Sequence, residues 1–279
     1  MAERIGLIAG SGRFPVLFAE TAGRRGVEVF AVAHRGETAS ELERVVSGIT
    51  WIYPGELEAM IQALLAAGVR RAVLVGGIAK PRLFNEMRPD ARALALLARV
   101  GVLRDDLVLR AVAAELEKEG IAVGPSTMYL QEVIPVAGVL SARKPSATEW
   151  RDIRVGFEVA KVIGQFDIGQ SVVVRSGGVI AVEGIEGTDA TIRRAGSLGN
   201  GDIVLVKVCK PMQDTRFDLP AVGPQTVAAL AEVRGRALAI EAGRTITLDR
   251  KEMIARADAA GIAVVAVDVA STAGGRDEP

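Results

Sequence analysis

One stretch of this chain, residues 210–226, concentrates the side chains that could do chemistry. Three prolines interrupt it, which argues against a helix. In an extended segment alternate residues share a face, so Asp214, Arg216 and Asp218 would point the same way. An acid–base–acid face beside a sheet end suits the cleavage of a phosphate bond, whereas the alternative is a solvated loop with a surface ion pair. The candidate groups in the segment are Lys210, Gln213, Asp214, Arg216 and Asp218.

A second candidate, Gly10-Ser11-Gly12, follows the first expected strand and opens a helix. Backbone N–H groups at such a turn can bind a phosphate. The third glycine of a dinucleotide fingerprint is missing, and the second expected strand leads into Ala33-His34-Arg35 rather than into an acid that could bind ribose. A nicotinamide cofactor is therefore disfavoured, while a nucleotide phosphate site and a purely structural turn both stay open.

A third candidate is the pair Gly76-Gly77, which ends another expected parallel strand and leads towards Lys80. Glycines at this position let a ligand approach the backbone, and Lys80 could bind an anion. A tight turn with a surface lysine is the alternative.

Residues 183–189 run from a strand into a helix. Thr188 is a natural N-cap, and Asp189 suits the first helical turn. The same stretch offers two glutamates and backbone N–H groups to a substrate, and the alternative is a capped helix with solvated charges.

The composition narrows the chemistry further. Lys plus Arg and Asp plus Glu both number 34, so no net charge attracts nucleic acid and we expect no such partner. The single cysteine, Cys209, excludes an intramolecular disulfide and fits a reducing cytosol. With one histidine, His34, a zinc site of the usual His/Cys type cannot be built. The remaining carboxylates, lysines, arginines and backbone amides suit Mg²⁺ and phosphate chemistry.

No apolar run approaches the roughly 18 residues that a membrane-spanning helix needs. Strand-like and helical patterns instead alternate over the first half of the chain. We expect strands at 4–9, 27–33, 49–53, 71–75 and 121–123, and helices at 14–25, 56–67, 91–100 and 106–118. This order predicts an α/β fold with a Rossmann-like parallel sheet, whose sites lie at the carboxyl ends of its strands.

The second half of the chain has a different pattern, in which helices alternate with two expected hairpins. One hairpin, within 170–183, turns at Ser176-Gly177-Gly178, and the other, within 238–248, turns at Ala242-Gly243. We therefore predict a mixed α/β domain here. The predicted organisation is a Rossmann-like domain at 1–130, a catalytic domain at 131–270, a ligand cleft between them and a disordered tail at 271–279.

Taken together, six stretches in this order resemble a known family over nearly the whole chain. They are IGLIAGSGRFP (5–15), GGIAKP (76–81), DDLVLR (105–110), DIGQSVVV (167–174), AVEGIEGTD (181–189) and KPMQDTRFDLPAVGPQT (210–226). The chain resembles the LpxI-type UDP-2,3-diacylglucosamine pyrophosphatases of lipid A synthesis. One departure is Met212, where the family usually has glycine.

The resemblance implies a two-domain, Mg²⁺-dependent hydrolase, with Mn²⁺ as a possible replacement, that cleaves UDP-2,3-diacylglucosamine to UMP and 2,3-diacylglucosamine 1-phosphate (lipid X). The essential aspartate of the family falls in its Asp-Leu-Pro motif, here Asp218-Leu219-Pro220. We expect Asp218 to ligate the metal or to orient the attacking water. Asp214 is either a second metal ligand or a surface charge.

A glycolipid nucleotide substrate also bears on the location of the protein. We expect a cytoplasmic protein that makes transient contact with the cytosolic face of the inner membrane, and we leave a homodimer open. The alternative functions are a Rossmann-type oxidoreductase, a different nucleotide-sugar hydrolase, and a nucleotide- or lipid-binding protein without turnover.

Overall fold

The computed structural model describes residues 3–77, 87–101, 105–216 and 219–268, with only the backbone of residues 105 and 106. Lys80, Asp218 and the tail expected at 271–279 lie outside the described residues. Contacts divide the chain into two compact units, Met1–Gln131 with Asp214–Asp218, and Glu132–Gln213 with Leu219–Pro279. A short segment from late in the chain therefore belongs to the first unit.

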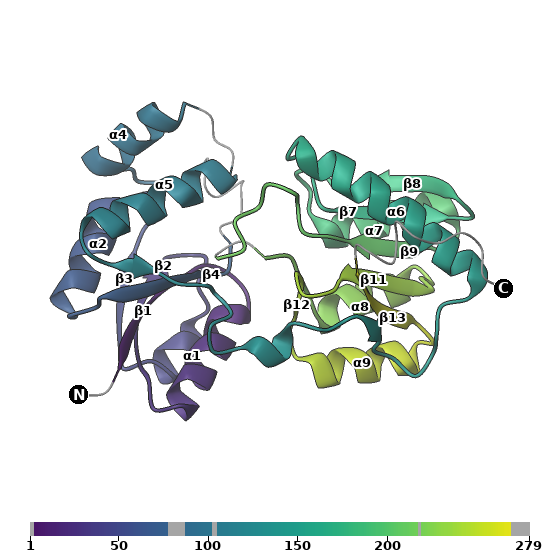
Figure 1. Cartoon of the computed structure of the whole chain (residues 1–279), viewed down its shortest axis with the longest axis horizontal. Helices are drawn as coiled ribbons and strands as arrows, with labels where there is room; N and C mark the ends of the chain where they lie inside the picture. Colours follow the sequence, from purple (N-terminus) through teal and green to yellow (C-terminus); the bar gives the residue numbers. More distant parts are fainter. Residues whose placement is uncertain (1–2, 78–86, 102–104, 217–218, 269–279) are drawn as a thin grey trace. The chain divides into compact units, whose positions relative to one another are not determined.

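The first unit is built on a five-stranded parallel sheet in the order β3-β2-β1-β4-β5 (Figure 1). Its strands are β1 (Arg4–Ala9), β2 (Glu28–His34), β3 (Gly48–Ile52), β4 (Arg71–Val75) and β5 (Ala122–Val123). Its helices among the described residues are α1 (Phe14–Arg24), α2 (Leu57–Ala66), α4 (Ala91–Val100) and α5 (Asp105–Lys118), with a 3₁₀ turn at Ser40–Arg44. The predicted Rossmann-like parallel sheet is confirmed.

Helices cover both faces of this sheet, with α1 on one face and α2, α4 and α5 on the other (Figure 1). Leu64, Leu96 and Leu116, one from each of the three helices on the second face, pack in one buried cluster with Ile8 and Leu74 of the sheet. Because helices bury both faces of the sheet, its strands appear in the sequence as continuous apolar runs rather than as alternating apolar and polar residues.

The strand order reverses between β1 and β4, which are neighbours although β2 and β3 come between them in sequence. Open α/β sheets bind their ligands beyond the carboxyl ends of the strands at such a point. The residues that follow β1 and β4 are therefore where a ligand is expected.

The second unit holds a six-stranded mixed sheet in the order β6-β13-β11-β9-β7-β8. Strands β9, β11 and β13 are parallel, while β7 is antiparallel to β8 and β9, and β6 is antiparallel to β13. The strands are β6 (Gly138–Val139), β7 (Ser171–Arg175), β8 (Gly178–Val182), β9 (Val204–Lys207), β11 (Ala237–Glu241) and β13 (Ala263–Val267). The predicted mixed α/β architecture is confirmed.

In the part of this unit that the structure describes, four helices cover the two faces of the mixed sheet. They are α6 (Ala147–Gln165), α7 (Thr188–Gly199), α8 (Pro224–Glu232) and α9 (Arg250–Ala259). Phe157 of α6 packs with Val204 and Val206, whereas Ile192, Leu230 and Met253 of the other three helices pack against the opposite face in a separate buried cluster. In the described part of the chain, no helix has the length and apolar character needed to cross a membrane.

The two expected hairpins have different outcomes. The first is confirmed, because β7 and β8 pair antiparallel around Ser176 and Gly177, whose N–H groups donate to Asp152. The second is wrong, because β11 lies between β9 and β13, while β12 (Ile246–Thr247) pairs in parallel with β10 (Ala221–Val222). Strand β11 is buried along its whole length, which makes it a central strand with two parallel neighbours.

Candidate functional site

The two glycine-rich turns of the first unit contact each other directly at the ends of β1 and β4. Gly10 donates its N–H to Val75 O at 2.9 Å. The N–H and the hydroxyl of Ser11 both donate to Gly77 O, at 2.7 and 2.9 Å. A Cβ atom on Gly10 would lie 2.4 Å from Gly77 O, so this close approach requires glycine. The structure thus brings two separately predicted turns together where the strand order reverses.

These contacts decide which donors are available to a phosphate. Ser11 uses both of its donors to bind Gly77 O, so its side chain holds the turns together. Gly12 has a φ of +85°, and no acceptor among the described residues takes its N–H. A Cβ atom on Gly12 would meet nothing within 4 Å. An anion at this turn would therefore be bound by Gly12 N–H and the start of α1 rather than by the Ser11 hydroxyl.

His34 lies at the same edge of the sheet, at the end of β2. Its Nδ1 is 2.9 Å from Ala9 O, to which the Thr38 hydroxyl also donates at 2.6 Å. Burial lowers the pKa of His34, so the ring is neutral near pH 7 and Nδ1–H donates to the carbonyl. The contacts of His34 thus fix the backbone that follows β1 and β2.

The segment at residues 214–216 reaches this unit beside the end of β5. Ser126, a buried residue, donates its N–H to Arg216 O at 2.5 Å. Gly124 donates to Ala72 O at 2.9 Å, which keeps the chain after β5 alongside β4. The segment that leads into the Asp-Leu-Pro motif is therefore held at the carboxyl end of a parallel strand.

Within this segment, Asp214 and Arg216 form an ion pair with several hydrogen bonds. The Arg216 N–H donates to Asp214 Oδ1 at 3.1 Å, and the Arg216 guanidinium donates to both carboxylate oxygens at 2.9–3.3 Å. The guanidinium hydrogen bonds are the largest cause of the lowered pKa of Asp214. We expected the two side chains to share the face of an extended segment. They do meet, but through a local turn in which the aspartate accepts the N–H two residues on.

Two residues of α5 extend this pair into a small charge cluster. Arg110 Nε lies 3.9 Å from Asp214 Oδ2, and Glu117 Oε1 lies 3.3 Å from Arg216 Nη1. Cations and carboxylates alternate from Arg110 through Asp214 and Arg216 to Glu117. Guanidinium groups at a strand end suit an anionic substrate.

A second polar cluster lies in the second unit, at the carboxyl end of β9. Lys207 Nζ donates to Thr188 Oγ1 and to Ala221 O, both at 3.0 Å. The Thr188 hydroxyl donates to Glu183 Oε1 at 2.9 Å and lies 3.3 Å from Ser171 Oγ. Buried Lys207 and Glu183 are thereby linked through one hydroxyl.

The same contacts correct the predicted N-cap. Helix α7 is capped by Gly187, with a φ of +82°, and Thr188 is the first helical residue. The Thr188 side chain does not cap the helix because its hydroxyl is engaged by Glu183 and Lys207. Asp189 lies in the first turn of α7, as expected.

Lys210 and Gln213 lie next to each other beyond β9. Lys210 Nζ donates to Asp167 at 2.6 Å, and the Lys210 N–H donates to Gln213 Oε1 at 2.9 Å. Gln213 is buried, and its Nε2 has no partner among the described residues. A buried polar atom in this state is a place where solvent or substrate can bind.

The sequence analysis did not predict an ion pair of the second unit that has a fully buried carboxylate. Glu241, fully buried at the end of β11, accepts from Lys161 Nζ at 2.6 Å and from Cys209 N–H at 2.8 Å. Lys161 also donates to Cys209 O at 2.8 Å. Lys207 and Glu241 each end an otherwise apolar strand, and that was the sequence signal that could have revealed them.

Of the two predicted metal ligands, Asp214 and Asp218, the structure describes Asp214. Among the described residues, no group of three or more His, Cys, Asp or Glu side chains is placed to hold a metal ion. Both oxygens of Asp214 accept from Arg216, whose positive charge opposes a nearby cation. Mg²⁺ commonly binds through one or two carboxylates together with substrate phosphates and waters. The contacts of Asp214 with Arg216 therefore do not favour Asp214 as a metal ligand.

Comparison with known families covers both units. The LpxI N-terminal domain model matches residues 4–133, and the LpxI C-terminal domain model matches residues 136–265. The UDP-2,3-diacylglucosamine pyrophosphatase LpxI of Caulobacter vibrioides (strain ATCC 19089 / CIP 103742 / CB 15) is 37% identical over 281 residues, covering 95% of this chain and 98% of the relative.

Similarities to solved structures are weak. The biotin carboxylase domain of a thermophilic 2-oxoglutarate carboxylase matches with a TM-score of 0.28 and 14% identity, over 64% of this chain and 36% of that chain. Glycinamide-RNase-transformylase T from Mycobacterium tuberculosis matches with a TM-score of 0.26 and 16% identity, over 64% of this chain and 44% of that chain. Similarities at this level carry no argument.

Proposed function

The chain belongs to the LpxI family and is a UDP-2,3-diacylglucosamine pyrophosphatase, and we propose that it works with Mg²⁺ and with Asp218 as the essential carboxylate. The reaction adds water across the pyrophosphate and yields UMP and 2,3-diacylglucosamine 1-phosphate (lipid X), a step of lipid A biosynthesis. The observation that carries this function is the match of both LpxI domains along the chain, together with the curated relative.

Asp218 is proposed as the essential group because it alone supplies the carboxylate of the Asp-Leu-Pro motif. Its described neighbours support this role. Arg216 is held by Asp214 and by Ser126 N–H, so the chain enters the motif from a fixed position at the end of β5. A free carboxylate is a weak base at neutral pH, which favours orienting a water or holding a metal over removing a proton unaided.

The pyrophosphate gains negative charge as its P–O bond breaks, so catalysis needs donors and cations placed in advance. In the first unit we assign this role to the Gly12 N–H and to the guanidinium group of Arg216. In the second unit, Lys207, Lys210 and the first turn of α7 offer a further set of donors.

Mg²⁺, or Mn²⁺ in its place, is proposed as the cofactor. When bound, it would polarise a phosphoryl oxygen and lower the pKa of a bound water. Asp218 is the proposed protein ligand, and Asp214 serves instead to hold Arg216.

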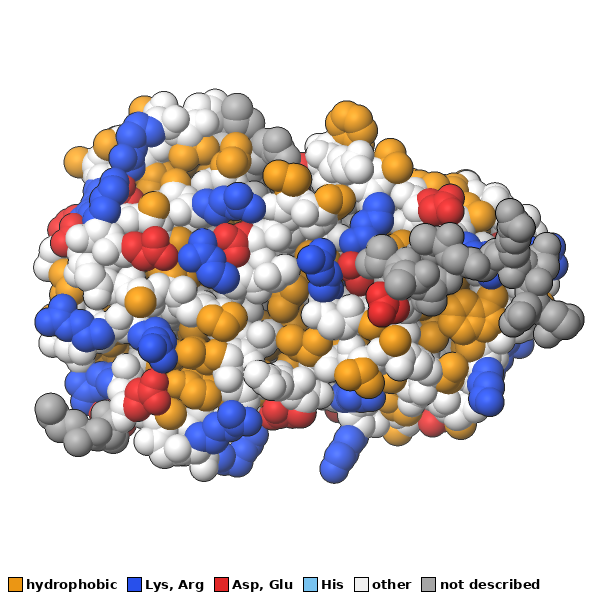
Figure 2. Space-filling view, in the orientation of Figure 1, with side chains coloured by type: hydrophobic (Ala, Val, Ile, Leu, Met, Phe, Trp, Pro, Cys, Tyr) orange, Lys and Arg blue, Asp and Glu red, His pale blue; other side chains and the backbone are white. Residues whose placement is uncertain are grey.

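We also propose transient contact with the membrane surface that carries the lipid substrate. Val162, Phe166 and Ile168 are 52%, 73% and 52% exposed around the end of α6, where hydrophobic side chains protrude (Figure 2). Phe166→Ser should weaken co-flotation with phosphatidylglycerol vesicles, with Val179→Ser as the control on β8. Equal flotation of Phe166→Ser and the wild type would contradict this contact.

The activity is tested by incubating the protein with UDP-2,3-diacylglucosamine, Mg²⁺ and detergent while UMP is measured by chromatography. Release of equal amounts of UMP and lipid X is the expected result. Binding of intact substrate with no UMP under any metal would favour a binding protein without turnover.

A further inference from the structure

We propose that Arg110 and Glu117 of α5 are positioning residues for hydrolysis, which hold residues 214–216, the segment that precedes the Asp-Leu-Pro motif in the sequence. This inference rests on the proposed function of Asp218. It assigns a role in the reaction to a helix on which the sequence indicated no catalytic group.

The position of the two residues on α5 supports the proposal. Arg110 and Glu117 are seven residues apart, so they lie on the same side of the helix. Arg110 faces the carboxylate of Asp214 at 3.9 Å, and Glu117 faces the guanidinium of Arg216 at 3.3 Å. The helix therefore presents a cation to the anion of the segment and an anion to its cation. Reversal of the segment would bring like charges together, so the arrangement selects one orientation.

The contacts within the segment support this role. Asp214 and Arg216 are joined by one backbone and three guanidinium hydrogen bonds, which couple the two side chains. Ser126 N–H binds the Arg216 carbonyl at 2.5 Å, which fixes the backbone two residues before Asp218. The side-chain contacts to α5 and the backbone contact to Ser126 thus hold the same residue from two directions.

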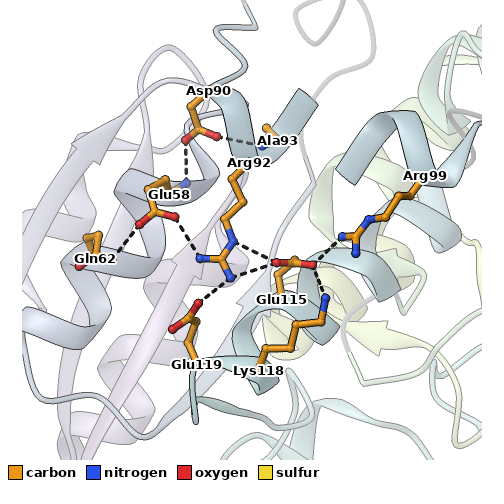
Figure 3. Close-up of polar contacts among 9 residues, drawn as sticks. All are labelled: Glu58, Gln62, Asp90, Arg92, Ala93, Arg99, Glu115, Lys118 and Glu119. Carbon is orange, nitrogen blue, oxygen red and sulfur yellow. Dashed lines mark hydrogen bonds and ion pairs between the residues drawn. The ribbon is translucent and has the colours of Figure 1, made fainter. Parts of the chain in front are cut away.

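Helix α5 is itself anchored by an ion-pair network (Figure 3). Glu115 is buried and accepts from Arg92 at 3.0 Å, from Arg99 at 2.5 Å and from Lys118 at 2.7 Å. Arg92 of α4 also binds Glu119, just beyond the end of α5, and Glu58 of α2. The network ties three helices together.

The network and the segment use different sides of α5. Glu115 projects roughly 140° from Arg110 around the helix, since successive residues turn by about 100°. The side that carries Arg110 and Glu117 is consequently left for the segment at residues 214–216. A helix fixed on one side can serve as a firm support on the other.

The test compares Glu117→Ala with Glu232→Ala. Glu232 forms a somewhat more exposed ion pair with Arg193 in the second unit, so its loss controls for the removal of a surface charge pair. We expect kcat for UMP release to fall about three- to tenfold in Glu117→Ala, with KM changed less than about twofold, because the substrate is not touched. Glu232→Ala should match the wild type. Glu117→Asp should recover part of the lost kcat.

A second measurement reports the placement of the segment without substrate. Lys210 precedes a proline and resists trypsin, so cleavage after Arg216 is the tryptic event that reports on this segment. It should become several-fold faster in Glu117→Ala while the unfolding temperature stays near that of the wild type. When Glu117→Ala is added to Arg216→Ala, kcat should not fall further, because Glu117 acts on the segment through its contact with Arg216.

The outcomes separate this inference from the proposed function. A wild type that turns over substrate and a Glu117→Ala variant with equal kcat would overturn the positioning role. A further loss of kcat from Glu117→Ala in the Arg216→Ala background would overturn it as well. A wild type without UMP release would overturn the proposed function and with it the catalytic role of Glu117, while the tryptic rate would still show whether Glu117 holds the segment.

Discussion

The guanidinium of Arg216 binds both carboxylate oxygens of Asp214, at distances of 2.9–3.3 Å. An ion pair in this segment was one of the two alternatives that the sequence left open, and the structure contains one between Asp214 and Arg216. The Asp214 carboxylate neutralises and orients a cation at the carboxyl end of β5, and we propose this role for Asp214 in place of metal binding. Asp214→Ala should therefore reduce activity by releasing Arg216, and Asp214→Asn, which keeps the acceptor oxygen for the backbone turn, should retain more activity.

Metal removal should abolish turnover. The proposed site relies on Mg²⁺ held by Asp218 and by substrate phosphates, so EDTA should stop UMP release, and Mg²⁺ or Mn²⁺ in excess should restore it. The unfolding temperature without substrate should barely change, because no metal group is assembled among the described residues. Full activity in EDTA would show that the arginines and lysines alone balance the charge.

The turn that follows β1 should be intolerant of any side chain on Gly10. A Cβ atom would lie 2.4 Å from a backbone oxygen, so Gly10→Ala should destabilise the protein by about 1–3 kcal/mol, the usual cost of overpacking. Gly23→Ala, in α1 with open space around its Cβ, is the matched control and should be neutral or slightly stabilising. Chemical denaturation measures both, and equal stability of the two variants would contradict the packing described.

The buried pair of Lys161 and Glu241 should matter for stability. Glu241→Ala should lower the free energy of unfolding by about 3 kcal/mol, because it leaves a largely buried cation without its partner. The control, Glu232→Ala, breaks an exposed pair and should cost less than about 1 kcal/mol. Replacing both members, as in Lys161→Met with Glu241→Leu, should recover much of the loss. A Glu241→Ala variant as stable as the control would refute this assignment.

The charge network on α5 should give a stability that depends on pH. Hydrogen bonds from Lys118, Arg99 and Arg92 lower the pKa of Glu115 to about 2, while burial opposes them. A carboxyl group whose pKa is lower in the folded protein stabilises it fully above its ordinary pKa near 4.5, and this stabilisation is lost as the pH falls towards 2. Glu115→Gln should cost about 1–3 kcal/mol at pH 7.

The difference between Glu115→Gln and the wild type should shrink between pH 4.5 and pH 2, as measured by denaturant unfolding across this range. Glu252→Gln is the control, because Glu252 forms an exposed pair within α9 that is worth only about 0.3–0.5 kcal/mol. A penalty for Glu115→Gln that stays constant from pH 7 to pH 3 would contradict the role of the network.

Much of the fold could be predicted because local patterns determine it. The apolar runs of β1, β2 and β4 are separated by amphipathic helices. This local pattern predicts a parallel sheet without any information on the rest of the chain. The hairpin at Ser176 could be predicted because the turn residues Ser176-Gly177-Gly178 lie between two strand patterns. The expected hairpin at Ala242 failed because a glycine turn shows that the chain changes direction but does not determine which strands pair.

The site was harder to predict because its contacts join distant parts of the chain. The glycine turns at Gly10 and Gly76 were found from their positions at strand ends, but not their mutual contact. The binding of Arg216 to Ser126 and Glu117 depends on tertiary packing, as does the pairing of Lys161 with Glu241. Nothing in the sequence next to these residues specifies their partners.

The rate of UMP release by Asp218→Ala, relative to the wild type, tests the central claim most directly. Both proteins are assayed with UDP-2,3-diacylglucosamine and saturating Mg²⁺, and thermal unfolding confirms that the variant is folded. We expect the wild type to release UMP and the variant to keep less than about a tenth of the wild-type rate, a loss of more than about 1.4 kcal/mol of transition-state stabilisation. A folded variant that keeps more than this would contradict Asp218 as the essential carboxylate, and a wild type that releases no UMP would contradict the function itself.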